Sequence, residues 1–414
     1  MNGVALATSF DASWERRLRV YPVLILGALA LAFVIVIGAG SGSSTASGRV
    51  GGDFPAFSGA GTIVSNGDID SLYDPATQAA AQIDLLGDED GFIMYPYAPH
   101  VAAAYQPLAA LPYRLAYVLH TALMVGAFVG ALALIRPMVP VVGRWFGATV
   151  GAVLTAYPVF VGVTGGQNTA ISLLLIAAAW RCWHDDRDAL AGVALSLLLF
   201  RPQYALPLIG LALLDRRWRT VLVAAAGAAV VWAINAVLFG AAWLTSWLRQ
   251  VEPLLEADAE INAVNEIAPI GVLQAILGAE STFALVAGGL VSAALAAGFA
   301  WLWWRRPVGL TERMAITTAG LMLLGPHAIY YDTALLAFAT LVMLDRRLID
   351  GRIAVLVWAA GAIHLTKHVL DVSPLIVVIF AVLALAAQRL LRRPGQAADG
   401  SERVLPIQDS YSVA

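Results

Sequence analysis

Apolar runs about 20 residues long constrain the fold of this chain more than any other feature. Three of them, at 21–40, 221–240 and 283–304, contain no charged side chain. A helix needs roughly 20 apolar residues to cross ~30 Å of hydrocarbon. Only 13% of the residues are charged and 60% are hydrophobic, whereas soluble domains are about 25% charged. The sequence therefore predicts an all-α polytopic integral membrane protein.

The apolar segments predict a bundle of about 12 transmembrane helices. These are expected at 20–40, 113–135, 145–164, 168–181, 189–200, 203–214, 220–240, 282–304, 313–325, 328–344, 353–366 and 374–391. Several segments are short for complete spans, and we interpret them as tilted spans, half-helices or packed interior pieces.

The distribution of arginine predicts the orientation of the bundle. Alternate connections between the segments hold most of the 25 Lys and Arg residues. The clearest groups are Arg16, Arg17 and Arg19; Arg216, Arg217 and Arg219; Arg305, Arg306 and Arg313; and Arg346, Arg347 and Arg352. The positive-inside rule makes this side cytoplasmic and places both termini inside.

Two acidic connections, 41–112 and 241–281, are predicted on the opposite side as the first and second extracytoplasmic loops. Their acids follow from membrane topology, and most are expected to be solvated. The membrane-embedded domain is expected to cover residues 1–393. The polar tail, 394–414, is predicted to be a disordered cytoplasmic segment.

The first loop has internal organisation that a linker would lack. Apolar residues at helical spacing predict an amphipathic helix at 54–64 that lies along the membrane surface. A second short helix is expected to start at Asp74-Pro75 and run through Ala81, since proline suits a first helical turn. Prolines flank a third apolar segment at 98–111. Together these helices are predicted to roof a cavity.

Asp53 is the first candidate for chemistry. It follows Gly51-Gly52 and precedes Phe54, so a flexible turn and an apolar anchor would hold its carboxylate near the membrane face. A carboxylate held there could act as a general base. The alternative is a structural role as the N-cap of the helix that follows.

A second group comprises Gln167, Arg201 and Gln203, at turns on the predicted outer side. Arg201 stands between two apolar segments away from the cytoplasm. A guanidinium there needs a partner, and a phosphate fits its donors well. The alternatives are a carboxylate from the acidic loops or snorkelling to the interface.

A third group, His327, Tyr331 and Asp332, follows Pro326 at a break between two apolar runs. On a helix that starts at Pro326, these side chains would share one broad face. Ionisable groups at membrane depth are costly and usually functional. A structural hydrogen-bond cluster at a helix end is the alternative. His364 and Lys367 suggest a further outer cluster, for which interfacial anchoring is at least as good an interpretation.

The order of several short motifs resembles glycosyltransferase family 87. The motifs are Gly-Asp-Phe-x-x-Phe-x-x-Ala-Gly (52–61), Leu-Tyr-Asp-Pro (72–75), Tyr-Pro (95–96), Pro-Leu-Ala-x-Leu-Pro (107–112), Gly-Gln-x-x (166–169), Leu-Phe-Arg-Pro-Gln (199–203) and Pro-His-x-x-x-Tyr-Asp (326–332). The similarity runs from about residue 50 to 345. The family often has lysine where Arg201 stands, and Tyr-Pro-Pro-Phe where this chain has Tyr-Pro-Tyr-Ala (95–98).

The resemblance implies a GT-C-like multi-spanning enzyme. It implies hexosyl transfer, with mannosyl the first candidate, from a polyprenyl-phosphate-linked donor to a cell-envelope glycolipid or glycan. The enzyme would sit in the bacterial cytoplasmic membrane with its active site facing the periplasm or the cell exterior. Carried over residue by residue, the resemblance makes Asp53 the catalytic base. It places Arg201 and His327 near the donor phosphate, and Gln167, Gln203, Tyr331 and Asp332 around the cavity.

Fixed cations could stabilise a departing lipid phosphate, so no metal and no cofactor are expected. The expected partners are the donor, the acceptor and membrane lipids, with no nucleic acid. A transporter or flippase of lipid-linked sugars is the alternative function. Transporters usually show internal repeats and helices broken at mid-membrane, whereas the polar groups here cluster at predicted outer helix ends.

The predicted orientation can be tested with reporter fusions. A reporter that is active only outside the cytoplasm should be active when it is inserted after residue 85, and inactive when it is joined after residue 403. The reverse pattern at either position would contradict the topology.

Overall fold

The computed structural model describes residues 20–21, 23–35, 51–86, 93–250, 253, 262–304 and 308–392. Among these residues the chain is helical and forms no strand, and an isolated antiparallel bridge joins Glu266 to Ile329. The predicted all-α class is thus confirmed. The tail expected to be disordered, 394–414, lies outside the described residues, as do several of the N-terminal arginines and loop acids.

Within the described part of the chain, four helices are long and apolar enough to cross a membrane. They are α5 (Tyr113–Ile135), α12 (Trp218–Phe239), α15 (Thr282–Trp304) and the continuous helical stretch Gly351–Leu370, which comprises α18 (Gly351–Ala360), η7 (Gly361–Thr366) and α19 (Lys367–Leu370). Shorter apolar helices accompany them at Val23–Ile35, Asp188–Phe200, Pro202–Leu214 and Leu375–Leu391. The structure supports a membrane protein, and the total of about 12 spans stays a prediction.

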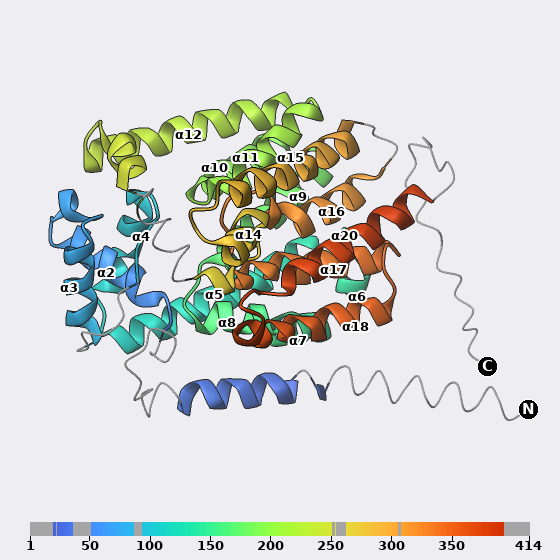
Figure 1. Cartoon of the computed structure of the whole chain (residues 1–414), viewed down its shortest axis with the longest axis horizontal. Helices are drawn as coiled ribbons and strands as arrows, with labels where there is room; N and C mark the ends of the chain where they lie inside the picture. The colour runs from blue at the N-terminus through green and yellow to red at the C-terminus, as the bar shows by residue number, and fades with distance from the viewer. Residues whose placement is uncertain are drawn as a thin grey trace, which may run out of the picture.

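The other helices of the bundle, which include three of these shorter apolar segments, are packed around the long spans. They are α6 (Pro140–Arg144), α9 (Thr169–His184), α10 (Asp188–Leu197), η3 (Leu198–Phe200), α11 (Pro202–Leu214), η4 (Ala263–Asn265), α14 (Pro269–Leu277), α16 (Leu310–Gly320), η5 (Leu321–Leu323), η6 (Tyr330–Thr333), α17 (Ala334–Asp345) and α20 (Leu375–Leu391). In Figure 1, α12 lies along one edge of the molecule and the Val23–Ile35 helix along the opposite edge.

Two predicted helices differ from the structure, each for a different reason. The predicted span 145–164 is a bent pair, α7 (Phe146–Thr155) and α8 (Tyr157–Thr164), with an angle of 73° between them. Pro158 in the first turn of α8 lacks the N–H that a continuous helix would need. The helix expected from Pro326 is also wrong. Helical structure begins only at η6, because Ile329 before it is extended.

The first loop folds into a compact helical unit at one end of the molecule (Figure 1). It contains α2 (Phe54–Ser65), η2 (Ile69–Ser71), α3 (Pro75–Leu86) and α4 (Pro99–Ala109). All three predicted helices are therefore present. The surface location predicted for the first is wrong, because most residues of α2 are buried. Its apolar side chains pack against α3, α4 and the start of α5 to form a separate core.

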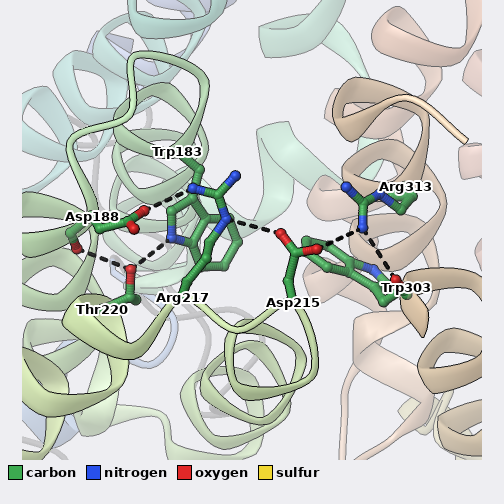
Figure 2. A network of polar contacts seen from close by, with 7 residues as sticks. All are labelled: Trp183, Asp188, Asp215, Arg217, Thr220, Trp303 and Arg313. Carbon is green, nitrogen blue, oxygen red and sulfur yellow. Dashed lines mark hydrogen bonds and ion pairs between the residues drawn. The ribbon is translucent and has the colours of Figure 1, made fainter. Parts of the chain in front are cut away.

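A polar network joins several helix ends at the C-terminal end of α11, the end away from Arg201 (Figure 2). Arg217 lies between two carboxylates: its Nη1 is 2.7 Å from Asp188 Oδ1, and its Nε is 3.0 Å from Asp215 Oδ2. Asp215 Oδ1 is also 3.2 Å from Arg313 Nη1. The network therefore joins the ends of α10, α11, α12 and α16, on the side that the arginine distribution predicts to be cytoplasmic.

Removing Asp215 should destabilise the protein, because two largely buried guanidinium groups would lose a shared carboxylate. We expect Asp215→Ala to lower the free energy of unfolding by about 3 kcal/mol, measured as a lower Tm in detergent. Asp84→Ala removes an exposed carboxylate in α3 and serves as the matched control. Equal Tm values for the two variants would contradict the stabilising role of the network.

Candidate active site

Two glycine turns interlock and place Asp53 beside Gln167. The backbone N–H of Asp53 donates to the carbonyl of Gly165, with an N···O distance of 2.8 Å. Gly166 has a φ of +72°, and a Cβ at this position would lie 2.6 Å from the carbonyl oxygen of Gly51. The turns approach so closely that side chains would not fit between them. As a result, Gln167 Nε2 donates a hydrogen bond to Asp53 Oδ2.

The sequence left two roles open for Asp53, a general base and a helix N-cap, and the contacts of its side chain differ from those of a capping aspartate. Asp53 is the N-cap residue of α2, but its side chain makes no capping hydrogen bond to that helix. Its carboxylate instead interacts with Gln167, from the connection between α8 and α9. The contrast with Asp74 is direct, because Asp74 Oδ2 accepts a hydrogen bond of 2.8 Å from the Thr77 N–H in α3.

Arg201 and Asp332 form a buried ion pair near the start of α11. Arg201 Nη1 is 2.6 Å from Asp332 Oδ1, and the two side chains are 4% and 6% exposed. The same carboxylate oxygen accepts a hydrogen bond of 2.9 Å from Thr169 Oγ1, at the start of α9. Arg201 thus has a carboxylate partner, which comes from the third predicted group and not from the acidic loops.

Tyr97 connects the first loop to this ion pair. Arg201 Nη2 donates to Tyr97 Oη at 3.1 Å, and the phenol donates to Asn168 Oδ1 at 3.3 Å. Burial raises the pKa of Tyr97, the Arg201 charge partly offsets this, and the carboxylates of Asp332 and Asp53 raise it further. The phenol is therefore neutral at physiological pH. Both carboxylates lie nearby, because Gln167 binds Asp53, Asn168 binds Tyr97 and Thr169 binds Asp332.

The other predicted cavity residues lie on neighbouring segments. Tyr331 is in η6 next to Asp332, and a Cβ at Gly162 in α8 would approach Tyr331 Cβ to 3.3 Å. A Cβ at Gly325 would approach Gln203 Cβ to 3.2 Å. Gln203 therefore packs beside the turn that leads to His327.

His327 pairs with a residue of the connection between α12 and α14, which the sequence predicts to be the second extracytoplasmic loop. Its Nδ1 contacts Glu266 Oε1, and the His327 side chain is 29% exposed. The same loop is linked to α19 through Lys367, whose Nζ donates to Asn265 Oδ1 and lies 5.3 Å from the centre of the Tyr330 ring. The third predicted group is therefore divided, since Asp332 binds Arg201 whereas His327 binds Glu266.

Sequence reasoning did not assign four residues that the structure places in these contacts: Tyr97, Asn168, Thr169 and Glu266. Tyr97 stands in Tyr-Pro-Tyr-Ala (95–98) and Asn168 directly follows Gln167, so their polar side chains were an available signal. Glu266 was one acid among many in an acidic loop. Thr169 carried no signal, because threonine is common near helix starts.

An apolar cavity of about 640 Å³ lies beside η6. Its lining comes mainly from α7, α17, α18 and α20, with further residues from the Val23–Ile35 helix and its flank. Thr333, which follows Asp332, lines one part of the cavity, and Trp145 and Gly351 line another. The cavity has the size and apolar character of a site for a hydrophobic ligand.

Metal-ligating and cationic side chains around the site determine which charged ligands it could hold. Within the part of the chain that the structure covers, no group of three His, Cys, Asp or Glu side chains is arranged to hold a metal ion. Around these contacts, positive charge comes from Arg201, Lys367 and, when protonated, His327. Arg201 Nε is buried and has no hydrogen-bond acceptor among the described residues.

Comparison with known proteins identifies one family. Residues 95–326 match the profile of Glycosyltransferase family 87, which is more than half of the chain. This range contains Tyr97, Gln167, Arg201 and Gln203, and ends at Pro326, before His327. A search of curated proteins finds no match.

Gly166→Ala tests whether the close contact of the two glycine turns is needed for glycosyltransferase activity. The new Cβ would collide with Gly51 and Phe54, so Asp53 should be displaced from Gln167 and activity should be largely lost. Gly67→Ala is the matched control, because Gly67 also has a positive φ, +83°, but has nothing within 4 Å of the added Cβ. The control carries only the backbone strain, about 1–2 kcal/mol. Full activity in Gly166→Ala would disprove the interlock.

Proposed function

Because this chain belongs to glycosyltransferase family 87, we propose that it transfers a hexosyl residue from a polyprenyl-phosphate-linked donor to a cell-envelope glycolipid or glycan. Mannose is our first candidate for the sugar. The proposed location is the bacterial cytoplasmic membrane, with the site on its outer face. Membership of a glycosyltransferase family favours an enzyme over the alternative, a transporter or flippase of lipid-linked sugars.

One observation carries the proposal: Asp53 is held by Gln167, which stands two residues before Thr169, and Thr169 binds the Asp332 of the buried pair with Arg201. In the proposed reaction, Asp53 accepts the proton of the acceptor hydroxyl as that oxygen attacks the anomeric carbon. The bond from the anomeric carbon to the phosphate oxygen breaks, and its electron pair leaves with the lipid phosphate. A single displacement of this kind inverts the anomeric configuration.

The proposed donor phosphate binds to Arg201 and His327. Nη1 and Nη2 of Arg201 bind Asp332 and Tyr97 through one N–H each, and its Nε has no acceptor among the described residues, so the guanidinium keeps donors for a ligand. The side chain of His327 is partly exposed and can present a cation when protonated. Fixed cations are the groups that stabilise charge developing on a leaving phosphate. Gln203 and Tyr331 would line the space around the sugar.

The apolar cavity supports a lipid-linked donor over a soluble nucleotide sugar. Its lining includes Thr333, so it lies beside the segment that carries Asp332, and its remaining lining is mostly aliphatic. A polyprenyl chain could occupy this cavity while its phosphate reaches Arg201. Each buried CH₂ group contributes about 0.8 kcal/mol to binding, so the chain would supply much of the donor affinity.

Asp53→Asn tests the proposed base. Asparagine keeps the size of the side chain and can still accept the hydrogen bond from Gln167, but it cannot take a proton from the acceptor. We expect turnover to fall about 10²-fold or more, while the protein remains folded and still binds the donor. The assay would use purified protein in nanodiscs with a polyprenyl-phosphate mannose donor.

The matched control is Asp74→Asn, which alters an N-cap aspartate of the same loop away from the site. It should retain wild-type turnover. If purified Asp53→Asn also turns over at the wild-type rate, Asp53 is not the base and Asp332 becomes the next residue to test.

A further inference from the structure

We infer that Glu266 is a positioning residue that orients His327 toward the donor phosphate. This inference rests on the proposed function, because it concerns the same donor site. It adds a residue from the second extracytoplasmic loop to a site that is otherwise built from the first loop and the helix ends.

Glu266 is a carboxylate that the fold buries almost completely. Only 2% of its surface is exposed, although most of the described acids in the predicted outer loops are exposed. One carboxylate oxygen, Oε1, pairs with His327 Nδ1, and the other, Oε2, accepts a hydrogen bond of 3.3 Å from the Ala328 N–H. Burying a carboxylate is costly unless charged or hydrogen-bonding groups surround it. Both oxygens meet this condition on a single segment, 327–328.

The backbone holds the two segments in register. The N–H of Ile267 donates to the carbonyl of Ala328 at 2.8 Å, and Glu266 and Ile329 form the isolated antiparallel bridge. Ile267, Ala268 and Ala328 are buried as well. The carboxylate therefore approaches the imidazole from a rigid backbone, which is the arrangement that positions a functional group accurately.

Gly271 in α14 makes the space that Glu266 occupies. A Cβ at this position would lie 2.5 Å from both Cδ and Oε2 of Glu266, and 2.7 Å from its Cγ. The carboxylate thus packs directly against the helix, on the side away from His327. A larger residue at 271 would push the carboxylate from its place.

The contact with Glu266 determines which nitrogen of the His327 ring faces a ligand. A carboxylate at Nδ1 favours a proton on that nitrogen and stabilises the imidazolium form. Nε2, on the opposite side of the ring, then points away from Glu266. A protonated His327 held in this orientation would donate from Nε2 to an anionic ligand, with a stronger bond than a neutral ring could make.

The inference can be tested by measuring binding of two probes, farnesyl phosphate and farnesol, to the full-length protein in detergent. Glu266→Gln keeps the shape and the acceptor for Ala328 but removes the charge. It should weaken farnesyl phosphate binding about tenfold, the loss of one charged hydrogen bond, and leave farnesol binding unchanged. His327→Gln should give a similar loss. The double variant should be no weaker than His327→Gln alone.

The possible outcomes separate this inference from the proposed function. If Glu266→Gln weakens both probes equally, or if its effect persists in the His327→Gln background, Glu266 acts only on folding and the inference is wrong. If His327→Gln weakens farnesyl phosphate binding but Glu266→Gln does not, only the role of Glu266 is refuted. Unchanged binding in His327→Gln would instead refute the proposed donor contact itself.

Gly271→Ala provides a second variant that leaves Glu266 and His327 chemically intact. It should also reduce binding of farnesyl phosphate more than that of farnesol, because the new methyl group displaces the carboxylate. Gly289→Ala in α15, with nothing within 4 Å of its Cβ, is the matched control and should bind both probes like the wild type. Wild-type binding of farnesyl phosphate by Gly271→Ala would contradict the inference.

Discussion

The buried ion pair between Arg201 and Asp332 is the interaction on which the arrangement of the site depends. Both groups are almost inaccessible to solvent, so each would be very costly without the other. Their pairing joins the break between η3 and α11 to the segment before α17. Thr169 and Tyr97 bind to the same pair, which brings α9 and the first loop to it as well. Four separate parts of the chain therefore meet at one charge pair.

A second buried charge cluster lies at the opposite end of the bundle. Asp215, at the other end of α11 from Arg201, shares its carboxylate between two arginines (Figure 2). α11 contains 13 residues, which corresponds to about 20 Å at 1.5 Å per residue. One helix thus carries a charged junction at each end. Each junction also retains a buried arginine Nε without an acceptor among the described residues, that of Arg201 at one end and that of Arg313 at the other.

The sequence was sufficient to predict the class, the long helices and the helices of the first loop, because length and apolar periodicity depend on local composition. It placed α5 and α15 at nearly their observed bounds. It could not predict which polar groups pair, since Arg201 and Asp332 are far apart in the chain. It also placed α2 on the surface, because an apolar stripe does not reveal whether lipid or protein will cover it. The helix expected from Pro326 failed because backbone pairing with the loop at Glu266 replaces it.

The separation between the apolar cavity and the polar groups has a consequence for the diversification of such an enzyme. The cavity is lined mostly by α7, α17, α18 and α20, whereas Asp53, Gln167 and Arg201 stand at turns outside those helices. Substitutions in the cavity could change which hydrocarbon chain is accepted without moving any group that handles the sugar. Carrier length and sugar identity would then be able to evolve as independent traits.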